Sequence, residues 1–173
     1  MSRCKVIAGN WKMNLDAVAG VALIEKLQAE CGGCSCGCRQ QQGPEVVVCP
    51  PFTTLPAVVE AARGTCLKVG AQNIHWAESG AFTGEISGAM LQTAGATHVI
   101  VGHSKRRQYF GETDATVNQR LLAGLASGLT VIVCVGELLQ ERVDGTTQAV
   151  VERQVRAALA GVDAAAMADV IIA

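Results

Sequence analysis

Short β-branched runs alternate with amphipathic helical patterns along this chain. Six runs are predicted as strands: residues 5–11, 45–49, 67–71, 98–102, 130–136 and 170–173. Each run is continuously apolar, which is typical of parallel strands covered on both faces. Parallel strands need crossover connections, which helices usually supply. The alternation predicts an α/β fold with a parallel sheet, either open and doubly wound or closed into a barrel.

Helices are predicted between the strands, where apolar residues recur every three or four positions. One helix places Val117, Leu121, Gly124 and Leu125 on a face behind a capping Asp114. Another buries Val151, Val155, Ala158 and Leu159 and ends at Gly161. Further helices are expected at about residues 17–30, 55–63, 88–93 and 104–110, the last with Ser104 as its N-cap.

Composition narrows the class of protein. Half of the 173 residues are hydrophobic, 17% are charged and the net charge is −1, so we expect one folded domain over residues 1–173. The basic run Lys105-Arg106-Arg107 is short and is followed by Glu112, which argues against nucleic acid or membrane partners. The N-terminus does not resemble a signal peptide, so a cytoplasmic location is expected.

Four of the eight cysteines crowd into one segment: Cys31, Cys34, Cys36 and Cys38. A thiolate metal site is one interpretation, but this spacing is tighter than that of zinc fingers. The glycine, serine and glutamine neighbours favour a low-complexity loop insert at about residues 31–42, with no metal. The other four, Cys4, Cys49, Cys66 and Cys134, lie in or beside apolar runs and are predicted to be small core residues.

Polar residues follow the strands, where ligands bind in α/β folds. They are Asn10, Lys12, Gln72, Asn73, His103 and Glu137. His103 precedes a predicted helix, whose N-terminal dipole favours a neutral imidazole that could polarise a carbonyl. Spacing alone does not separate this role from that of a strand anchor. His75 and His98 are expected to be structural, and no dinucleotide fingerprint or P-loop favours nucleotide binding.

Five motifs occur together along the chain: "GNWKMN", "AQNIHWAESGAFTGEIS", "GHSKRRQYFGE", "VIVCVGE" and "VIIA". In this order they resemble the triosephosphate isomerase family. The resemblance implies a (β/α)8 barrel, of which this chain holds about five and a half to six βα units. It also implies a homodimer that needs no cofactor and interconverts dihydroxyacetone phosphate and glyceraldehyde 3-phosphate through an enediolate.

The resemblance also implies roles for individual residues. Asn10 and Lys12 would bind substrate, and Lys12 would also be catalytic by offsetting the phosphate and enediolate charge. His103 would polarise the carbonyl and shuttle protons between the two oxygens, and Thr83 and Glu85 would lie at the dimer interface. Two departures stand out. Lys105 occupies the family's glutamate position and would repel Lys12, and the chain stops before the segment that carries the family's glutamate base and lid. The implied function is therefore triosephosphate isomerase, with this chain alone nearly inactive; the alternative is a non-catalytic fragment that needs a C-terminal partner segment.

Overall fold

The structure is a computed structural model that describes residues 5–30 and 43–173. The strands are β1 (Val6–Asn10), β2 (Glu45–Cys49), β3 (Lys68–Ala71), β4 (His98–Val101), β5 (Thr130–Val133) and β6 (Val170–Ile172). The α-helices are α1 (Ala17–Glu30), α2 (Leu55–Ala61), α3 (Gly88–Thr93), α4 (Ser104–Tyr109), α5 (Asp114–Ala126), α6 (Leu139–Val143) and α7 (Thr147–Ala158). A 3-10 turn, η1 (Ala166–Asp169), precedes β6. All six predicted strands form.

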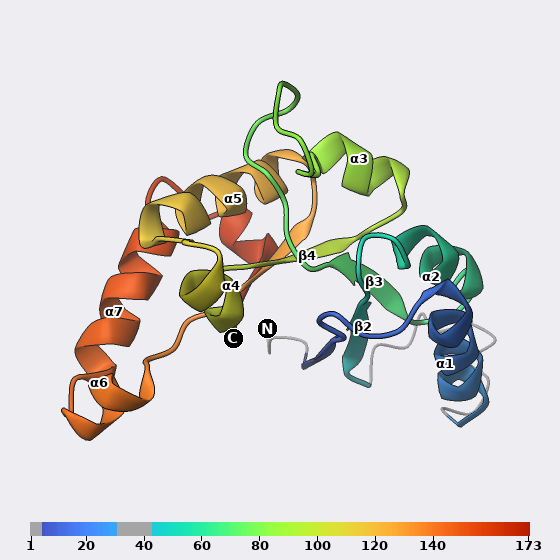
Figure 1. Cartoon of the computed structure of the whole chain (residues 1–173), viewed down its shortest axis with the longest axis horizontal. Coiled ribbons are helices and arrows are strands. Elements are labelled where there is room, and N and C mark those ends of the chain that lie inside the picture. The colour runs from blue at the N-terminus through green and yellow to red at the C-terminus, as the bar shows by residue number, and fades with distance from the viewer. Residues whose placement is uncertain (1–4, 31–42) are drawn as a thin grey trace. The chain divides into compact units, whose positions relative to one another are not determined.

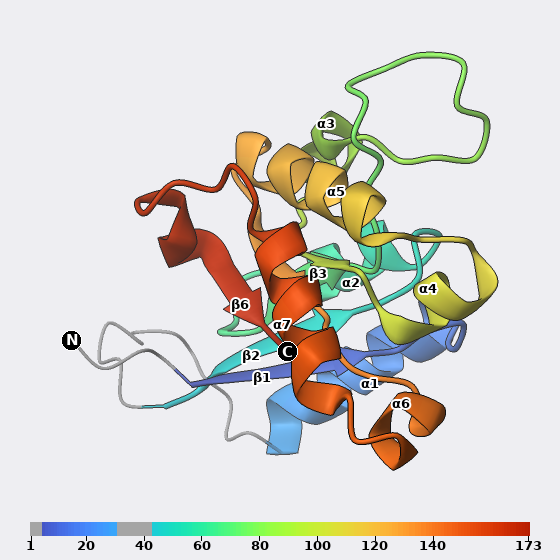
Figure 2. The same ribbon diagram turned by 90° about the vertical axis from the view of Figure 1, so that its left-hand side faces the viewer.

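The strands are hydrogen-bonded in chain order, β1-β2-β3-β4-β5-β6. β1 pairs with β2 in parallel, with Val6 opposite Glu45, and the two strands lie side by side in Figure 2. β5 and β6 also pair in parallel, with Val131 opposite Val170. Sequential parallel pairing through helical crossovers is what the βα repeat predicts. Within each unit, the carboxyl ends of neighbouring parallel strands lie at the same edge, and the polar residues of that unit follow them.

Backbone contacts group the chain into two compact units. Unit 1 comprises Met1–Gln72 and Met90–His98, and unit 2 comprises Asn73–Ala89 and Val99–Ala173. The predictions of one domain over residues 1–173 and of a loop insert at about residues 31–42 stay predictions, and residues 31–42 lie outside the described part of the chain.

Unit 1 is built on the packing of α1 against α2, which lie side by side in Figure 1. Gly20 permits the close approach, because a Cβ atom there would stand 2.8 Å from Cγ2 of Thr54. Ile24 of α1 and Val58 of α2 are fully buried, and Val47 of β2 joins them in the core. Close packing of such side chains supplies the apolar burial that stabilises the unit.

Unit 2 is built on α5, which packs against β5 and α7. Gly124 lets α5 approach the strand, because a Cβ atom there would stand 2.8 Å from Cγ2 of Val131. The predicted face of α7 is right at Ala158 but wrong elsewhere: the buried residues are Val150, Gln154 and Ala158, whereas Val151, Val155 and Leu159 are half-buried. The predicted Val151 and Val155 instead line an open hollow of about 740 Å³. Adjacent valines make either face apolar, so packing against α5 decides the rotation of the helix.

Two predicted caps are also wrong. The N-cap of α4 is His103, and Ser104 is the first helical residue. The N-cap of α5 is Thr113, whose hydroxyl accepts a hydrogen bond from the Thr116 amide in a capping box. Asp114 lies one position later, where its carboxylate makes ion pairs instead. Ser, Thr and Asp are all good caps, so the composition near a helix start leaves the position open by a residue.

The strands differ in burial. All four residues of β4 are buried, as continuous apolar runs predict. In β1 the expectation is wrong, because Ile7 is 59% exposed and the two residues after it are exposed as well. As an end strand of the hydrogen-bonded order, β1 has fewer neighbours to cover it. Within the described residues, no helix is long and apolar enough to cross a membrane.

Candidate active site

The turn after β1 carries the first pair of candidate residues, Asn10 and Lys12. Lys12 has a φ of 54°, a left-handed conformation that is uncommon for a residue other than glycine. The Asn10 side chain accepts a hydrogen bond from the Lys12 amide at 2.9 Å, which supports that conformation. The lysine side chain is exposed. Strained backbone of this kind concentrates at functional sites, so the turn is a good candidate for binding.

Gln72, directly after β3, fixes the same turn from the other side. Its Nε2 donates to the carbonyl oxygen of Lys12 at 2.9 Å and to that of Cys49 at 2.8 Å. The backbone amide of Trp11 also donates to Cys49, at 3.0 Å. One amide group therefore ties together the carboxyl ends of β1, β2 and β3. Gln72, which the sequence placed among the polar residues of the site, is a scaffold residue here.

The turn after β4 carries His103. Gly102 before it has a φ of 71°, and a Cβ atom there would stand 2.9 Å from Cγ1 of Val117, so glycine is required. Nδ1 of His103 accepts a hydrogen bond from the Lys105 amide at 3.2 Å. An accepting Nδ1 carries no proton, which leaves the proton of a neutral ring on Nε2. His103 is therefore both a helix cap and a potential donor through Nε2.

Lys105 is exposed and lies along its own helix. Its Nζ donates to Oε1 of Gln108 at 3.0 Å and stands 5.5 Å from the ring centre of Tyr109. Lys105 belongs to unit 2, whereas Lys12 belongs to unit 1. The repulsion between these two lysines stays a prediction.

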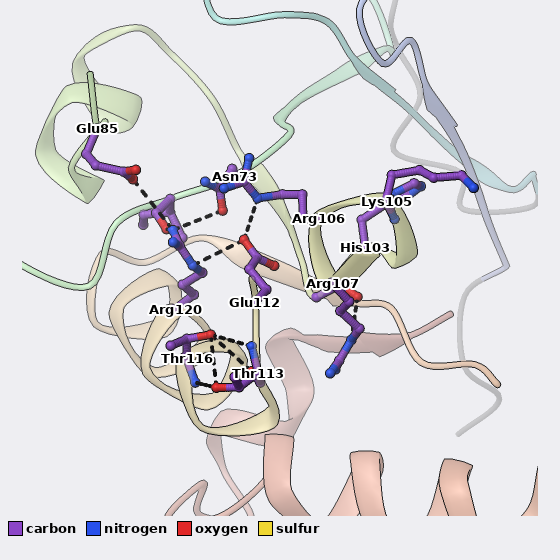
Figure 3. Close-up of polar contacts among 12 residues, drawn as sticks. Asn73, Glu85, His103, Lys105, Arg106, Arg107, Glu112, Thr113, Thr116 and Arg120 are labelled. Carbon is purple, nitrogen blue, oxygen red and sulfur yellow. Dashed lines mark hydrogen bonds and ion pairs between the residues drawn. The ribbon is translucent and has the colours of Figure 1, made fainter. Parts of the chain in front are cut away.

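Unit 2 contains a buried ion cluster, formed by Arg106, Glu112 and Arg120 (Figure 3). Glu112, whose side chain is 2% exposed, is paired with Arg106 and stands 3.4 Å from Nε of Arg120. Nη1 of Arg120 donates to Oδ1 of Asn73 at 3.1 Å. Burial lowers the pKa of Arg120, while the charges of Glu112 and Glu85 raise it. Asn73, one of the polar residues expected after β3, thus supports Arg120.

The loop with Thr83 and Glu85 is held by the same arginine. Oε2 of Glu85 lies 3.7 Å from Nη1 of Arg120, and the guanidinium lies 5.0 Å from the ring centre of Trp76. His75 is buried and stacks on Trp76, consistent with the structural role expected for it. Thr83 itself is exposed. The dimer-interface role of Thr83 and Glu85 stays a prediction.

Glu137 lies after β5, where the sequence places a candidate polar residue. Its Oε1 accepts a hydrogen bond from Nε of Arg142 at 2.7 Å. A backbone hydrogen bond and then this contact lower the pKa of Glu137, so it is a carboxylate at neutral pH. Gly136, which precedes Glu137, is held by the side chain of Gln154. Oε1 of Gln154 accepts a hydrogen bond from the Gly136 amide at 2.8 Å, and Nε2 of Gln154 donates to the Gly136 carbonyl oxygen at 3.0 Å.

Cysteines give no metal centre in the described part of the chain, where no group of three His, Cys, Asp or Glu side chains could hold a metal ion. Cys4 and the cluster Cys31, Cys34, Cys36 and Cys38 lie outside the described residues. Cys49 is buried as predicted, and burial raises the pKa of the Cys134 thiol. Cys66 and Cys134 are both half-buried, and Cys66 is disulfide-bonded, so the prediction of core residues is wrong for these two.

Sequence reasoning missed Glu112 and Arg120 as members of the site's support. Charged residues on a helix or in a loop are usually solvated, so their residue type predicts exposed side chains. The available signal was weak: Arg120 falls three residues after Val117 and directly before Leu121, on the apolar side of α5. A charge at such a position needs a buried partner, which Glu112 supplies.

The sequence model of the triosephosphate isomerase family matches residues 5–173. A triosephosphate isomerase from Solibacter usitatus is 49% identical over 171 residues, which cover 99% of this chain and 66% of the relative. One from Acetivibrio thermocellus is 49% identical over 173 residues, again covering 66% of the relative.

A solved structure agrees. A triosephosphate isomerase from Bartonella henselae superposes with a TM-score of 0.83 at 36% identity, over 97% of this chain and 66% of that one. The barrel-family fold predicted from the sequence is confirmed, with this chain as a partial barrel. The chain spans about 66% of the length of the relatives it matches.

Proposed function

Because this chain belongs to the triosephosphate isomerase family, we propose that it supplies the polarising histidine and the substrate-binding lysine of a triosephosphate isomerase. The substrates are dihydroxyacetone phosphate and glyceraldehyde 3-phosphate, and the reaction serves glycolysis and gluconeogenesis in the cytoplasm. The observation that carries this proposal is the hydrogen bond from the Lys105 amide to Nδ1 of His103.

That hydrogen bond bears directly on the chemistry. When a proton leaves the carbon beside a carbonyl, negative charge develops on the carbonyl oxygen. A neutral imidazole with its proton on Nε2 can donate a hydrogen bond to this oxygen and return a proton to it later. The occupied Nδ1 keeps the ring in that tautomer. In the proposal His103 therefore polarises the carbonyl and moves protons between the two substrate oxygens.

Lys12 supplies the compensating positive charge. Its ammonium is exposed beside a strand end, and its backbone is held by Asn10 and Gln72. We infer that the ammonium offsets the charges of the phosphate and the enediolate, and that Asn10 also contacts substrate. A fixed cation of this kind costs no reorganisation when charge develops. No metal or organic cofactor takes part in this scheme.

The relatives extend for about a third of their length beyond the part that this chain matches. We infer that the glutamate base and the closing lid come from this extension, and that the 173 residues alone isomerise triose phosphates negligibly. General-base catalysis is worth about 10²–10⁴-fold, and loss of a lid admits water. We also infer that Thr83 and Glu85 contribute to a homodimer, as in the family.

A chimera tests the assignment. Residues 1–173 are joined to the last third of the Solibacter usitatus relative, and isomerisation is followed with a coupled dehydrogenase. We expect turnover from the chimera and almost none from the 173-residue chain. His103→Gln in the chimera should lower kcat by at least about 10²-fold. Lys12→Met should cost a similar factor, about 10²–10³, whereas Lys26→Met, at an exposed lysine on α1, should change little.

Two results would contradict the proposal. A folded chimera whose kcat survives His103→Gln would remove His103 from the chemistry. A folded chimera without turnover would favour the alternative, a non-catalytic fragment that depends on a partner segment.

A further inference from the structure

Arg107 makes two hydrogen bonds to the turn that carries His103, one from its backbone and one from its side chain. Its backbone amide donates to the carbonyl oxygen of His103 at 3.2 Å, and Nε of its side chain donates to the carbonyl oxygen of Gly102 at 2.9 Å. These two carbonyls belong to the peptide groups that flank the Cα atom of His103. One residue therefore constrains both peptide planes from which the imidazole projects.

The side-chain half of this grip is anchored elsewhere in unit 2. Nη1 of Arg107 donates to Oδ1 of Asp114 at 2.6 Å, and Oδ2 of Asp114 lies 3.2 Å from Nε of Arg153. Asp114 begins α5 and Arg153 belongs to α7. The Arg107 side chain is 16% exposed, so water competes little for these contacts. The guanidinium thus ties the turn to two longer helices.

The turn needs such support because of its conformation. Gly102 has a φ of 71°, and a side chain there would meet both Val117 and the carbonyl oxygen of Cys134, at 2.9 and 3.1 Å. The Gly102 residue is buried, so its carbonyl requires a protein donor. A guanidinium can donate in two directions from one rigid plane, to the carbonyl through Nε and to the carboxylate through Nη1. A lysine ammonium has no such fork.

We propose that Arg107 is a positioning residue for His103, and that its contacts with the Gly102 carbonyl and Asp114 set the orientation and tautomer of the imidazole. Arg107 acts through the backbone that places Nδ1 beside the Lys105 amide. Its value to catalysis rests on the proposed function, but the positioning itself can be measured without turnover.

The test is nitrogen NMR of the His103 ring in the 173-residue chain, labelled at histidine. In the unsubstituted protein we expect two well-separated ring nitrogen resonances, with the proton on Nε2. Arg107→Lys keeps a cation beside Asp114 but loses the two-directional donor. We expect its two ring resonances to move towards each other, because the tautomers then exchange. Arg153→Lys is the matched control, since it alters the outer pair on the same carboxylate, and it should leave the ring unchanged.

The outcomes are separable. Unchanged His103 resonances in a folded Arg107→Lys protein overturn the proposal, as does an equal change in Arg153→Lys. If Arg107→Lys does not fold, Asp114→Asn decides the question, because it leaves Arg107 in place without a charged anchor. A partial shift there supports the proposal, and an unchanged ring overturns it. Failure of the isomerase assignment would appear only in the chimera's turnover, not in these spectra.

Discussion

The turn after β1 in unit 1 and the turn after β4 in unit 2 carry the two principal candidate residues, but they are held by different chemistry. Around Lys12 the supports are neutral: the amides of Asn10 and Gln72. In unit 2 the supports are charged. Arg107 is paired with Asp114 at the His103 turn, and Glu112 is paired with Arg106 and Arg120.

The two kinds of support make the two turns sensitive to different substitutions. A neutral hydrogen bond contributes about 0.5–1.5 kcal/mol net, and its loss leaves at most an unsatisfied carbonyl. A buried ion pair contributes little net, but removing one partner leaves an uncompensated charge and costs about 3–5 kcal/mol. Single substitutions should therefore damage unit 2 more than unit 1.

The largest effect is expected at Glu112. Glu112→Ala leaves Arg106 and Arg120 without their shared carboxylate, and Arg120 is 7% exposed. The free energy of unfolding should fall by about 3–5 kcal/mol in a urea titration. Glu152→Ala is the matched control, because its 54% exposed carboxylate pairs with Arg156 at the surface and should cost at most about 1 kcal/mol. Equal losses would show that the cluster is solvated.

Gln72 provides the corresponding test in unit 1. Gln72→Leu removes both hydrogen bonds to the carbonyls of Lys12 and Cys49 and should cost about 1–3 kcal/mol. The exposed Gln119 on α5 offers a control, since Gln119→Leu should change stability by about 0.5 kcal/mol or less. If Gln72→Leu costs as much as Glu112→Ala, the contrast between neutral and charged supports fails.

His98 in unit 1 should make the free energy of unfolding depend on pH. Its ring is buried, with Nε2 3.1 Å from Oε1 of Glu45 and Nδ1 2.8 Å from the Thr97 hydroxyl. Burial lowers the pKa of His98 below its ordinary value of 6.5. The charge of Glu45 opposes this shift by raising the pKa, and the charge of Lys68 lowers it further. The unfolded chain therefore binds this proton more readily than the folded chain. The contribution of His98 to the free energy of unfolding should be fully present above about pH 6.5 and should decrease as the pH falls below that value.

The slope from His98 is at most about 1.4 kcal/mol per pH unit. Thermal unfolding between about pH 5 and 7 measures it, and His98→Gln should remove that part of the slope. A slope that persists in the variant would place the acid sensitivity in other groups.

Lys105 should have the smallest effect on stability. Its ammonium is exposed and contacts only Gln108 and Tyr109 in the described surroundings, so Lys105→Glu should change unfolding by about 0.5 kcal/mol or less. In the chimera the same change should raise kcat/KM, because it replaces a repulsion with Lys12 by an attraction. Equal kinetics for both versions would show that Lys105 points away from Lys12.

Much of the fold could be predicted because its signals are local. Short, mostly apolar runs marked all six strands, and glycine marked the turn before His103. The short helix α6 and the turn η1 were missed because neither is long enough to show a helical period. The motif resemblance identified the family, but it says nothing of the contacts that hold Lys12 or His103.

The βα order, the family and the residue types at the strand ends follow from patterns that are local to the chain. Only the tertiary structure decided that His103 caps α4, that Gln154 rather than Val155 faces inward, and that Glu112 and Arg120 are buried together. Capping and helical periodicity are local signals that leave the exact cap and the buried face open by about a residue, and packing then selects one alternative. Burial of a charge depends on a partner elsewhere in the fold: Arg120 can be buried because packing brings Glu112 to it.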